Sequence, residues 1–186
     1  VIAVSVHQDA PGSSDISIDL ELVGTKVSGS GGGGLGANLI QNPSFELGAG
    51  ANADGWVNTT TGVPQIWTTG TAKDGAKSYS LAGDDANRVR QENIAIVSGK
   101  TYELSAWYRI PTLVSGNIKF DTSDKYDGEF AEKKLQLLTP NWTRVSGQFT
   151  ATNTTLSVRL FTSEFYGTCY VDDLSLKEVD AGTSDP

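Results

Sequence analysis

Apolar and polar residues alternate with a period of two along most of the chain beyond residue 37. In TYELSAWYRI, residues 101–110, Tyr102, Leu104 and Ala106 occupy every second position. The alternation recurs in GNIKFDTS, WTRVSGQFTA, TLSVRLFTS and CYVDDLSLKEV, with clusters of Gly, Pro, Asn and Asp between them. Alternation of this kind is typical of strands that bury one face. The sequence therefore predicts many short strands joined by turns.

Helical periodicity is almost absent from the same region. One segment, EFAEKKLQLL at residues 129–138, is a candidate helix, but its apolar positions form a poor stripe, so we expect no more than one turn. Many short strands within one domain-sized segment are typical of two packed sheets. We therefore predict an all-β fold, a β-sandwich or jelly roll of two antiparallel sheets.

A glycine-rich run, SGSGGGGLG, occupies residues 28–36. Because Gly loses more conformational freedom on ordering than any other residue, we interpret this run as a linker. The segment before it, residues 1–27, contains an alternating strand, a turn and a second strand that resemble TLSVRLFTSEFYGTCYVDDLSLKEV near the C-terminus. It is predicted to be the last hairpin of a preceding similar module, or else an unrelated N-terminal hairpin. The main domain is predicted at residues 37–180, and residues 181–186 begin another linker.

Charge and composition narrow the functional classes. The 186 residues include 14 Lys and Arg against 22 Asp and Glu, a formal net charge of −8. Affinity for nucleic acid depends on basic contacts with phosphates, so a nucleic-acid partner is not expected. No apolar stretch approaches the ~20 residues of a membrane helix, and no signal peptide is recognised. With one Cys, Cys169 in an apolar pattern, and one His, His7, neither a histidine metal cluster nor a Ser-His-Asp triad is favoured.

Several segments together resemble a known family of modules. In order they are ANLIQNPSFELG at 37–48, DGW at 54–56, DGAKSYSL at 74–81, VRQENIAIVSGKTYELSAWYRI at 89–110, NWTRVSGQFTA at 141–151 and YVDDLSL at 170–176. This order resembles the carbohydrate-binding modules of the family 4, 9, 16 and 22 type. The resemblance implies a galactose-binding-like jelly roll with a structural calcium ion and a concave glycan-binding face. It also implies a non-catalytic, secreted module appended to a polysaccharide-degrading enzyme.

The calcium ion would need oxygen ligands, six to eight in all, from carboxylates and backbone carbonyls. The resemblance implies the following ligands: the side chains of Glu46, Asp74 and Asp172, and the backbone oxygens of Lys77 and of Asn42 or Ser44. The alternative is that the three acids are ordinary surface carboxylates.

Glycan recognition calls for aromatic rings, which stack on the C–H faces of sugars, and for planar polar groups, which bind sugar hydroxyls. Trp107 lies on the polar side of its strand, and Trp56 and Trp142 match family positions that often carry a tryptophan. Trp67 is the least assignable of the four. Each tryptophan has the alternative of a core position, because large aromatic residues are usually well buried.

The polar candidates are Gln91, which matches a family position whose amide reaches into the cleft, together with Arg90 and Arg159. Tyr126 and Phe130 lie in a variable segment where some relatives carry a further stacking aromatic. On three of the predicted strands, alternation places several side chains at outward-facing positions. We expect these side chains to share the concave face: Trp107, Arg109, Lys119, Asp121 and Arg159.

The function predicted from these features is binding of a β-linked plant-type polysaccharide: xylan, β-glucan or glucomannan. The acidic balance makes polyuronates less suitable ligands, although Arg88, Arg90, Arg159 and Lys119 would allow a local basic face. A structural, adhesin-like module is the main alternative, followed by a polysaccharide lyase. A two-carboxylate glycosidase is disfavoured for the acid pair Asp172 and Asp173, since neighbours on a strand point to opposite faces.

Overall fold

The structure is a computed structural model that describes residues 36–50, 52–59, 66–81, 88–122, 133–135 and 138–179. The chain divides into two compact units, Val1–Gly32 and Gly33–Pro186, and every described residue belongs to the second unit. The hairpin predicted at residues 1–27 and the linker start at residues 181–186 lie outside the described residues.

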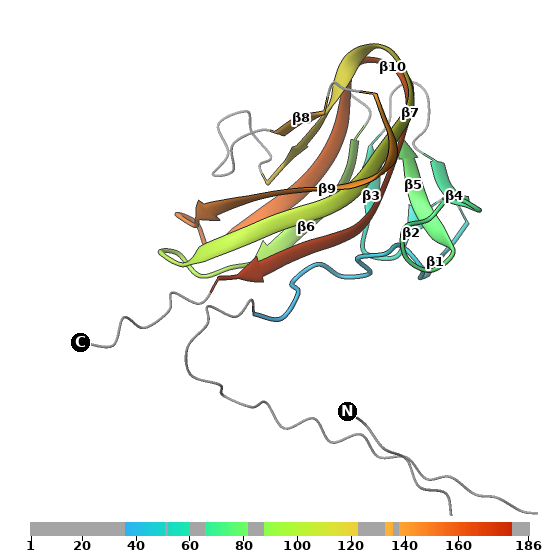
Figure 1. Cartoon of the computed structure of the whole chain (residues 1–186). Helices are drawn as coiled ribbons and strands as arrows, with labels where there is room; N and C mark the ends of the chain where they lie inside the picture. Colours follow the sequence, from blue (N-terminus) through green and yellow to red (C-terminus); the bar gives the residue numbers. More distant parts are fainter. Residues whose placement is uncertain are drawn as a thin grey trace, which may run out of the picture. The chain divides into compact units, whose positions relative to one another are not determined.

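The described residues form β-strands and no helix (Figure 1). The strands are β1 (Gly48–Ala49), β2 (Asn52–Ala53), β3 (Val57–Thr59), β4 (Ile66–Thr69), β5 (Lys77–Leu81), β6 (Arg88–Ala95), β7 (Thr101–Asp121), β8 (Lys133–Leu135), β9 (Thr139–Thr150) and β10 (Thr155–Glu178). In the candidate helix at residues 129–138, the part Lys133–Leu135 is strand β8, so a helix there is wrong for those residues. No helix of the described segments is long and apolar enough to span a membrane.

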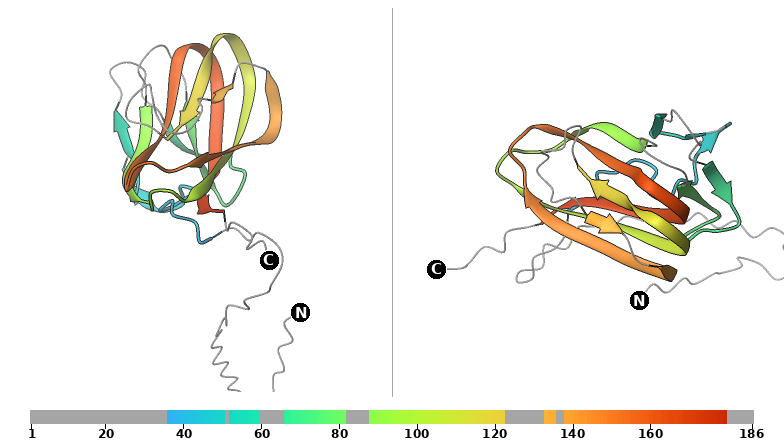
Figure 2. Two further views of the ribbon diagram at one scale, coloured as in Figure 1. Left: turned by 90° about the vertical axis from the view of Figure 1, so that its left-hand side faces the viewer. Right: turned by 90° about the horizontal axis from the view of Figure 1, so that it is seen from above.

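Two antiparallel sheets result because β7 and β10 are long enough to take part in both (Figures 1 and 2). Sheet I contains β3, β6, the first half of β10, the second half of β7, and β8. Sheet II contains β4, β5, the second half of β10, the first half of β7, and β9. This is the predicted jelly-roll β-sandwich, which confirms the fold class.

The two long strands pass from one sheet to the other at a shared corner. Their pairing shifts register between Ser163 and Tyr166 of β10, where Glu164 adopts a positive φ of 47°. Gly116 on β7 lies against this point with a φ of 79°, and a Cβ there would be 2.0 Å from the Glu164 carbonyl oxygen. Only glycine fits such a close backbone approach in a left-handed conformation. The corner therefore fixes which halves of β7 and β10 belong to which sheet.

The core lies between the sheets and follows the predicted alternation. Even-numbered residues of β7 face inward in both sheets, from Leu104 and Ile110 in sheet II to Ile118 and Phe120 in sheet I. Cys169 is buried in the same core, and burial raises the pKa of its thiol, as expected of a packing residue rather than a reactive one. Odd-numbered residues of β7 consequently lie on the outer faces, where recognition is open to them.

The opening segment, residues 36–41, runs beside the end of β10. Gly36 N–H donates to the Glu178 carbonyl oxygen at 2.7 Å, and Leu39 N–H donates to that of Leu176 at 2.8 Å. The Asn38 side chain adds two bonds to β10, donating to Leu174 O at 3.0 Å and accepting from Leu176 N–H at 2.9 Å. This pairing accounts for the ANLIQN sequence at the start of the domain.

Candidate functional site

The side chains predicted to share one binding face are divided between two. Trp107 and Arg109 lie on the half of β7 that pairs with β9, on the outer face of sheet II. Lys119, Asp121 and Arg159 lie beyond the corner, on the outer face of sheet I. The expectation of a single face is wrong. Alternation along a strand shows which side chains point the same way, but it does not show where the strand bends from one sheet into the other. The outer faces of a sandwich point in opposite directions.

The outer face of sheet I gathers cations around one aromatic ring. Arg159 lies between Asp121 of β7 and Arg90 of β6, and Phe161 lies between Lys119 and Arg88 in the same way. We call the set of Arg88, Arg90, Lys119, Arg159 and Phe161 the basic face. Lys119 Nζ is 5.1 Å from the centre of the Phe161 ring, and the Cζ atoms of Arg88 and Arg159 are 5.6 and 5.5 Å away. The face thus joins residues from three neighbouring strands.

Arg159 is held by a bidentate ion pair. Its Nε and Nη2 atoms donate to the two carboxylate oxygens of Asp121, each at 2.7 Å. Arg159 is only 3% exposed and Asp121 only 6%. Two parallel charge-assisted bonds fix the plane of a guanidinium as well as its position. Arg159 therefore acts as a rigid element of the basic face.

The same face carries one ion pair and two buried polar atoms without a hydrogen-bond partner. Arg90 Nε is 2.6 Å from a carboxylate oxygen of the neighbouring Glu92. Arg88 Nε and Asn117 Oδ1 are buried atoms without a hydrogen-bond partner in the structure. Asn117 lies opposite Ser163 on the outer parity of sheet I, two residues before Lys119. Buried polar atoms are normally paired, so these two are suited to a ligand or to water.

Two predicted ligand residues make structural contacts within the domain. Trp56 is 4% exposed, its ring lies 5.0 Å from that of Phe45, and its Nε1 donates to the Asn42 carbonyl oxygen at 3.2 Å. The amide of Gln91 accepts from Gln41 N–H at 2.9 Å and donates to Gln41 O at 2.9 Å, holding the opening segment against β6. Both side chains are only 4% exposed, although Gln91 also lines a pocket of about 360 Å³, and their roles as sugar ligands stay predictions.

The remaining tryptophans lie in the layer of sheet II. Trp107 is half-buried, and Lys73 Nζ lies 4.5 Å from the centre of its ring. Trp142 is also half-buried and lies on β9, two residues before Arg144, which is paired with Trp107 across the two strands. Trp67 donates from Nε1 to the Phe45 carbonyl oxygen at 2.8 Å. None of these rings lies on the basic face. Tyr126 and Phe130 lie outside the described residues.

Sequence reasoning missed Phe161. The available signal was its parity: Phe161 alternates with Leu160 and Thr162 and so shares the outward side of its strand with Arg159. Although buried, Phe161 is not part of the hydrophobic core cluster, because its ring lies outside sheet I beneath the cations. An aromatic residue at an outward position of a strand is a sequence signal for a binding surface.

The acids predicted to hold calcium meet at the turn formed by residues 71–77. Glu46 Oε1 accepts from Ala76 and Lys77 N–H at 2.9 and 2.7 Å. Asp172 Oδ2 accepts from Lys73 and Asp74 N–H at 2.7 and 3.0 Å. The hydroxyl of Ser44 donates to Asp74 Oδ2 at 3.1 Å. The donor chemistry around this turn is all oxygen, which is what Ca²⁺ prefers.

Among the described residues, the acids at the 71–77 turn form no ion pair, although Lys73 and Lys77 belong to the turn. Asp172 is fully buried; burial raises its pKa to about 6, against the lowering effect of its backbone hydrogen bonds. The ammonium of Lys77 lies 3.5 Å from the centre of the Trp67 ring, and that of Lys73 lies over the Trp107 ring. Within the described segments, no ion pair involves Glu46 or Asp172. Those segments hold no group of three His, Cys, Asp or Glu side chains placed to bind a metal. An ion here would need backbone carbonyls as well.

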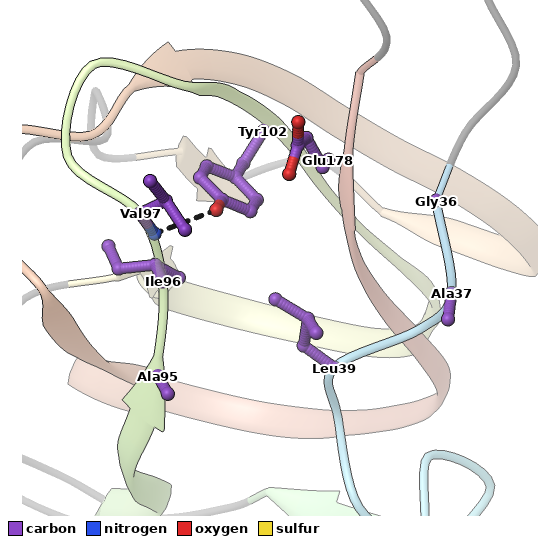
Figure 3. Close-up of a pocket in the computed structure, with 8 residues that line it drawn as sticks. All are labelled: Gly36, Ala37, Leu39, Ala95, Ile96, Val97, Tyr102 and Glu178. Atoms are coloured by element: carbon purple, nitrogen blue, oxygen red, sulfur yellow. Dashed lines mark hydrogen bonds between the residues drawn. The ribbon is translucent and has the colours of Figure 1, made fainter.

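Two pockets flank the opening segment. One, of about 280 Å³, is lined by apolar groups that include Leu39, Ile96 and Tyr102, whose hydroxyl accepts from Val97 N–H at 2.9 Å (Figure 3). The other, of about 360 Å³, is lined by the following residues: Leu39, Gln41, Gly55, Gln91, Glu92, Asn93, Ile94 and Ala95. Neither of these two pockets includes a residue of the basic face.

Solved structures with the same fold include several carbohydrate-binding modules. The xylan-binding CBM22-1 domain of Paenibacillus barcinonensis Xyn10C is 20% identical, with a TM-score of 0.59 over 78% of this chain and 97% of that one. TmCBM61, solved with β-1,4-galactotriose, is 18% identical, with a TM-score of 0.55 over 75% and 97%. The CBM22-1–GH10 modules of Clostridium thermocellum xylanase 10B, complexed with xylohexaose, are 14% identical, with a TM-score of 0.51 over 73% and 28%.

Among curated protein sequences, none matches this chain. The family profile CBM_4_9, described as Carbohydrate binding domain, matches residues 37–164. That match begins at the opening segment and ends at the corner, so it includes every residue of the basic face. The chain therefore belongs to the Carbohydrate binding domain family of CBM families 4 and 9.

Proposed function

We propose that this chain is a non-catalytic module that binds a β-linked polysaccharide on the outer face of sheet I. The observation that carries the proposal is the basic face, where a fixed guanidinium and further cations stand beside buried polar atoms without partners. Sugar hydroxyls need such planar, charged hydrogen-bonding groups. Relatives with the same fold are described as binding xylan or as complexed with β-1,4-galactotriose, which supports a β-1,4-linked chain such as xylan.

Sheet I suits this function better than sheet II. On sheet II, Lys73 already lies over Trp107, and Arg109 lies over Tyr170 with 5.4 Å between Cζ and the ring centre. Arg144 of the same sheet is paired with Glu103. The cations of that face thus lie over separate rings or in an ion pair, and one buried atom, Arg109 Nε, has no hydrogen-bond partner. On sheet I, three cations converge on the single ring of Phe161, and the same face carries two buried atoms without a hydrogen-bond partner, Arg88 Nε and Asn117 Oδ1.

A matched pair of variants tests the proposed face. Arg90 is ion-paired with Glu92 on sheet I, and Arg144 is ion-paired with Glu103 on sheet II. Such surface pairs contribute about 0–1 kcal/mol to stability, so both alanine variants should fold. A hydrogen bond from a charged group to a ligand is worth about 1.5–3 kcal/mol, so Arg90→Ala should weaken binding about 10-fold or more in affinity electrophoresis with soluble xylan. Arg144→Ala should leave it unchanged, and equal effects would contradict the assignment.

We also propose that Ca²⁺ binds at the 71–77 turn. Glu46, Asp74 and Asp172 would supply carboxylate oxygens, with backbone oxygens from Lys77 and from Asn42 or Ser44. The support is the meeting of three acids at one turn whose own two lysines lie over tryptophan rings. The ion would join β10 to the turn and to residues 42–46. Its role would be structural, since the basic face lies on the other sheet.

We further propose that the module is extracellular and belongs to a larger, multi-modular enzyme whose catalytic domain it directs to polysaccharide. The support is the solved structure in which a CBM22-1 module of this fold is joined to GH10 modules. If the chain is instead a structural module without glycan binding, no soluble polysaccharide should change its mobility in affinity electrophoresis. If it is a polysaccharide lyase, it should release products with unsaturated ends from the polysaccharide.

A further inference from the structure

We propose that the cavity of about 360 Å³ beside β6 binds the uncharged terminal sugar of the glycan chain that lies on the basic face. The inference rests on the proposed function, because it extends the same glycan into a second site. We call this cavity the amide pocket, since three carboxamide side chains line it: Gln41, Gln91 and Asn93. A cavity of this size with a few convergent polar groups is typical of sites for small ligands.

The amide pocket begins where the pairing of β3 with β6 ends. β3 pairs with residues 88–90 of β6, and the pocket is lined by residues 91–95 of the same strand. One of these, Glu92, is also ion-paired with Arg90 of the basic face, with 2.6 Å between Oε1 and Nε. The pocket and the basic face therefore meet at this ion pair, so one glycan chain can contact both.

A β-bulge in β6 shapes the lining of the pocket. Glu92 and Asn93 together lie opposite a single residue of β10, Ser157, because the pairing shifts register between Leu156 and Val158. Asn93 adopts a left-handed φ of 57°, a conformation that Asn tolerates better than most residues. Bulges redirect side chains and are frequent beside functional sites. Both side chains of this bulge line the amide pocket.

The wall opposite β6 is fixed by the backbone of Gln41. Its N–H donates to Gln91 Oε1, and its carbonyl oxygen accepts from Gln91 Nε2, both at 2.9 Å. Gly55 completes the wall with a φ of 80°, and a Cβ there would be 3.3 Å from both Gln41 Oε1 and Gln91 Nε2. The amides of these two glutamines thus converge on space that a side chain at residue 55 would fill.

The lining suits sugar hydroxyls better than charged groups. A hydroxyl both donates and accepts hydrogen bonds, and a carboxamide offers a donor and an acceptor on one planar group. The side chains of Gln41 and Asn93 are exposed and make no hydrogen bond to other described residues. The described lining contains no cation, and its one acid, Glu92, is paired with Arg90. An uncharged sugar therefore fits the pocket better than an anionic one.

The polar lining stops at Leu39, which lines both the amide pocket and the apolar pocket of about 280 Å³. Leu39 points towards the apolar pocket, whose two polar side chains are already engaged (Figure 3). The Tyr102 hydroxyl accepts from Val97 N–H at 2.9 Å, and Glu178 is ion-paired with Lys100 at 2.9 Å. Burying hydroxyls without hydrogen-bond partners costs free energy. The amide pocket therefore suits the last sugar of a chain, which does not continue past Leu39.

A variant that removes one amide without moving the wall tests the pocket. Gln41→Ala truncates an exposed side chain and keeps both backbone bonds to Gln91. Xylohexaose should bind this variant about 3–10-fold more weakly in calorimetry, the value of one hydrogen bond between uncharged groups. Long unbranched xylan, whose bound segments are nearly all internal, should keep its affinity in affinity electrophoresis. Asn93→Gly, which suits the left-handed backbone, should act in the same way.

Gln148→Ala is the matched control, because Gln148 is an exposed amide on β9, opposite Glu103 in sheet II. It should bind both ligands like the parent chain. If Gln41→Ala and Asn93→Gly bind xylohexaose as tightly as this control, the inference is overturned while the proposed function stands. Equal weakening of xylohexaose and of long xylan would overturn recognition of the terminal sugar. If the parent chain binds no β-linked polysaccharide, the proposed function itself is overturned.

Side-chain amide signals of the ¹⁵N-labelled parent chain give a second measurement that needs no variant. Xylohexaose should shift the side-chain signals of Gln41 and Asn93 and leave that of Gln148 in place. Xylohexaose whose reducing end has been reduced to an alditol identifies the end that binds: the shifts are lost if the reducing end enters the pocket and are kept if the other end does. Shifts on the strands of the basic face without any shift of the Gln41 and Asn93 side chains would overturn the inference.

Discussion

The buried ion pair between Arg159 and Asp121 offers a sharp test of how the basic face is held. Asp121→Ala removes the carboxylate that receives two 2.7 Å bonds and leaves the guanidinium of Arg159, 3% exposed, without its main partner. Breaking a buried pair from one side costs about 3–5 kcal/mol, because an uncompensated charge stays in a region of low dielectric constant. Domains of this kind unfold with about 5–15 kcal/mol, so the loss is large but measurable.

Urea denaturation followed by tryptophan fluorescence gives the free energy of unfolding for each variant. The double variant Asp121→Leu/Arg159→Met replaces both charges by apolar groups and should lose less stability than Asp121→Ala, since no charge is left buried. The slope of free energy against urea should stay constant if the folded state remains compact. A cost below about 1 kcal/mol for Asp121→Ala, the value of an exposed pair, would show that the pair is solvated and would refute the reasoning.

Three further predictions concern the remaining assignments. If Ca²⁺ binds at the 71–77 turn, saturation at about 100 times its dissociation constant adds roughly 2.7 kcal/mol to the free energy of unfolding. EDTA should then lower the melting temperature by several degrees, and Asp172→Ala should abolish that response. Identical melting curves with and without EDTA would contradict the site. Deletion of residues 1–35 should leave a soluble domain with unchanged affinity for xylan, and failure to fold would show that those strands are integral to it. Trp56→Ala should cost about 3–5 kcal/mol of stability, as for other buried aromatic residues, while affinity per folded molecule is retained; a stable variant that no longer binds xylan would restore Trp56 to the ligand site.

The strands were predictable because their signal is local. A period of two over four to ten residues already separates the inner from the outer side of a strand, so the inward positions Leu104, Ile118 and Leu160 follow from the sequence. Cys169 was predictable as a core residue for the same reason. The jelly roll then follows from packing many half-buried strands into two layers.

The composition of the site was less predictable because it depends on contacts between distant segments. Trp107 and Lys119 share one parity on one strand, but the Gly116 corner places them on different sheets. Trp56 is buried where the ring of Phe45 packs against it, and the amide of Gln91 is hydrogen-bonded to the backbone of Gln41. Pairing partners of this kind are set by the tertiary fold, which alternation along the chain does not encode.

The most direct test of the central claim, that the outer face of sheet I binds polysaccharide, is a titration of the ¹⁵N-labelled chain with soluble xylan oligosaccharides followed by backbone amide chemical shifts. Perturbations should concentrate in β6, in the second half of β7 and in the first half of β10, the strands that carry the basic face. The first half of β7 and β9, which carry Trp107 and Trp142, should remain unperturbed. Shifts confined to β9 and the first half of β7, or no shifts with any β-linked oligosaccharide, would contradict the account.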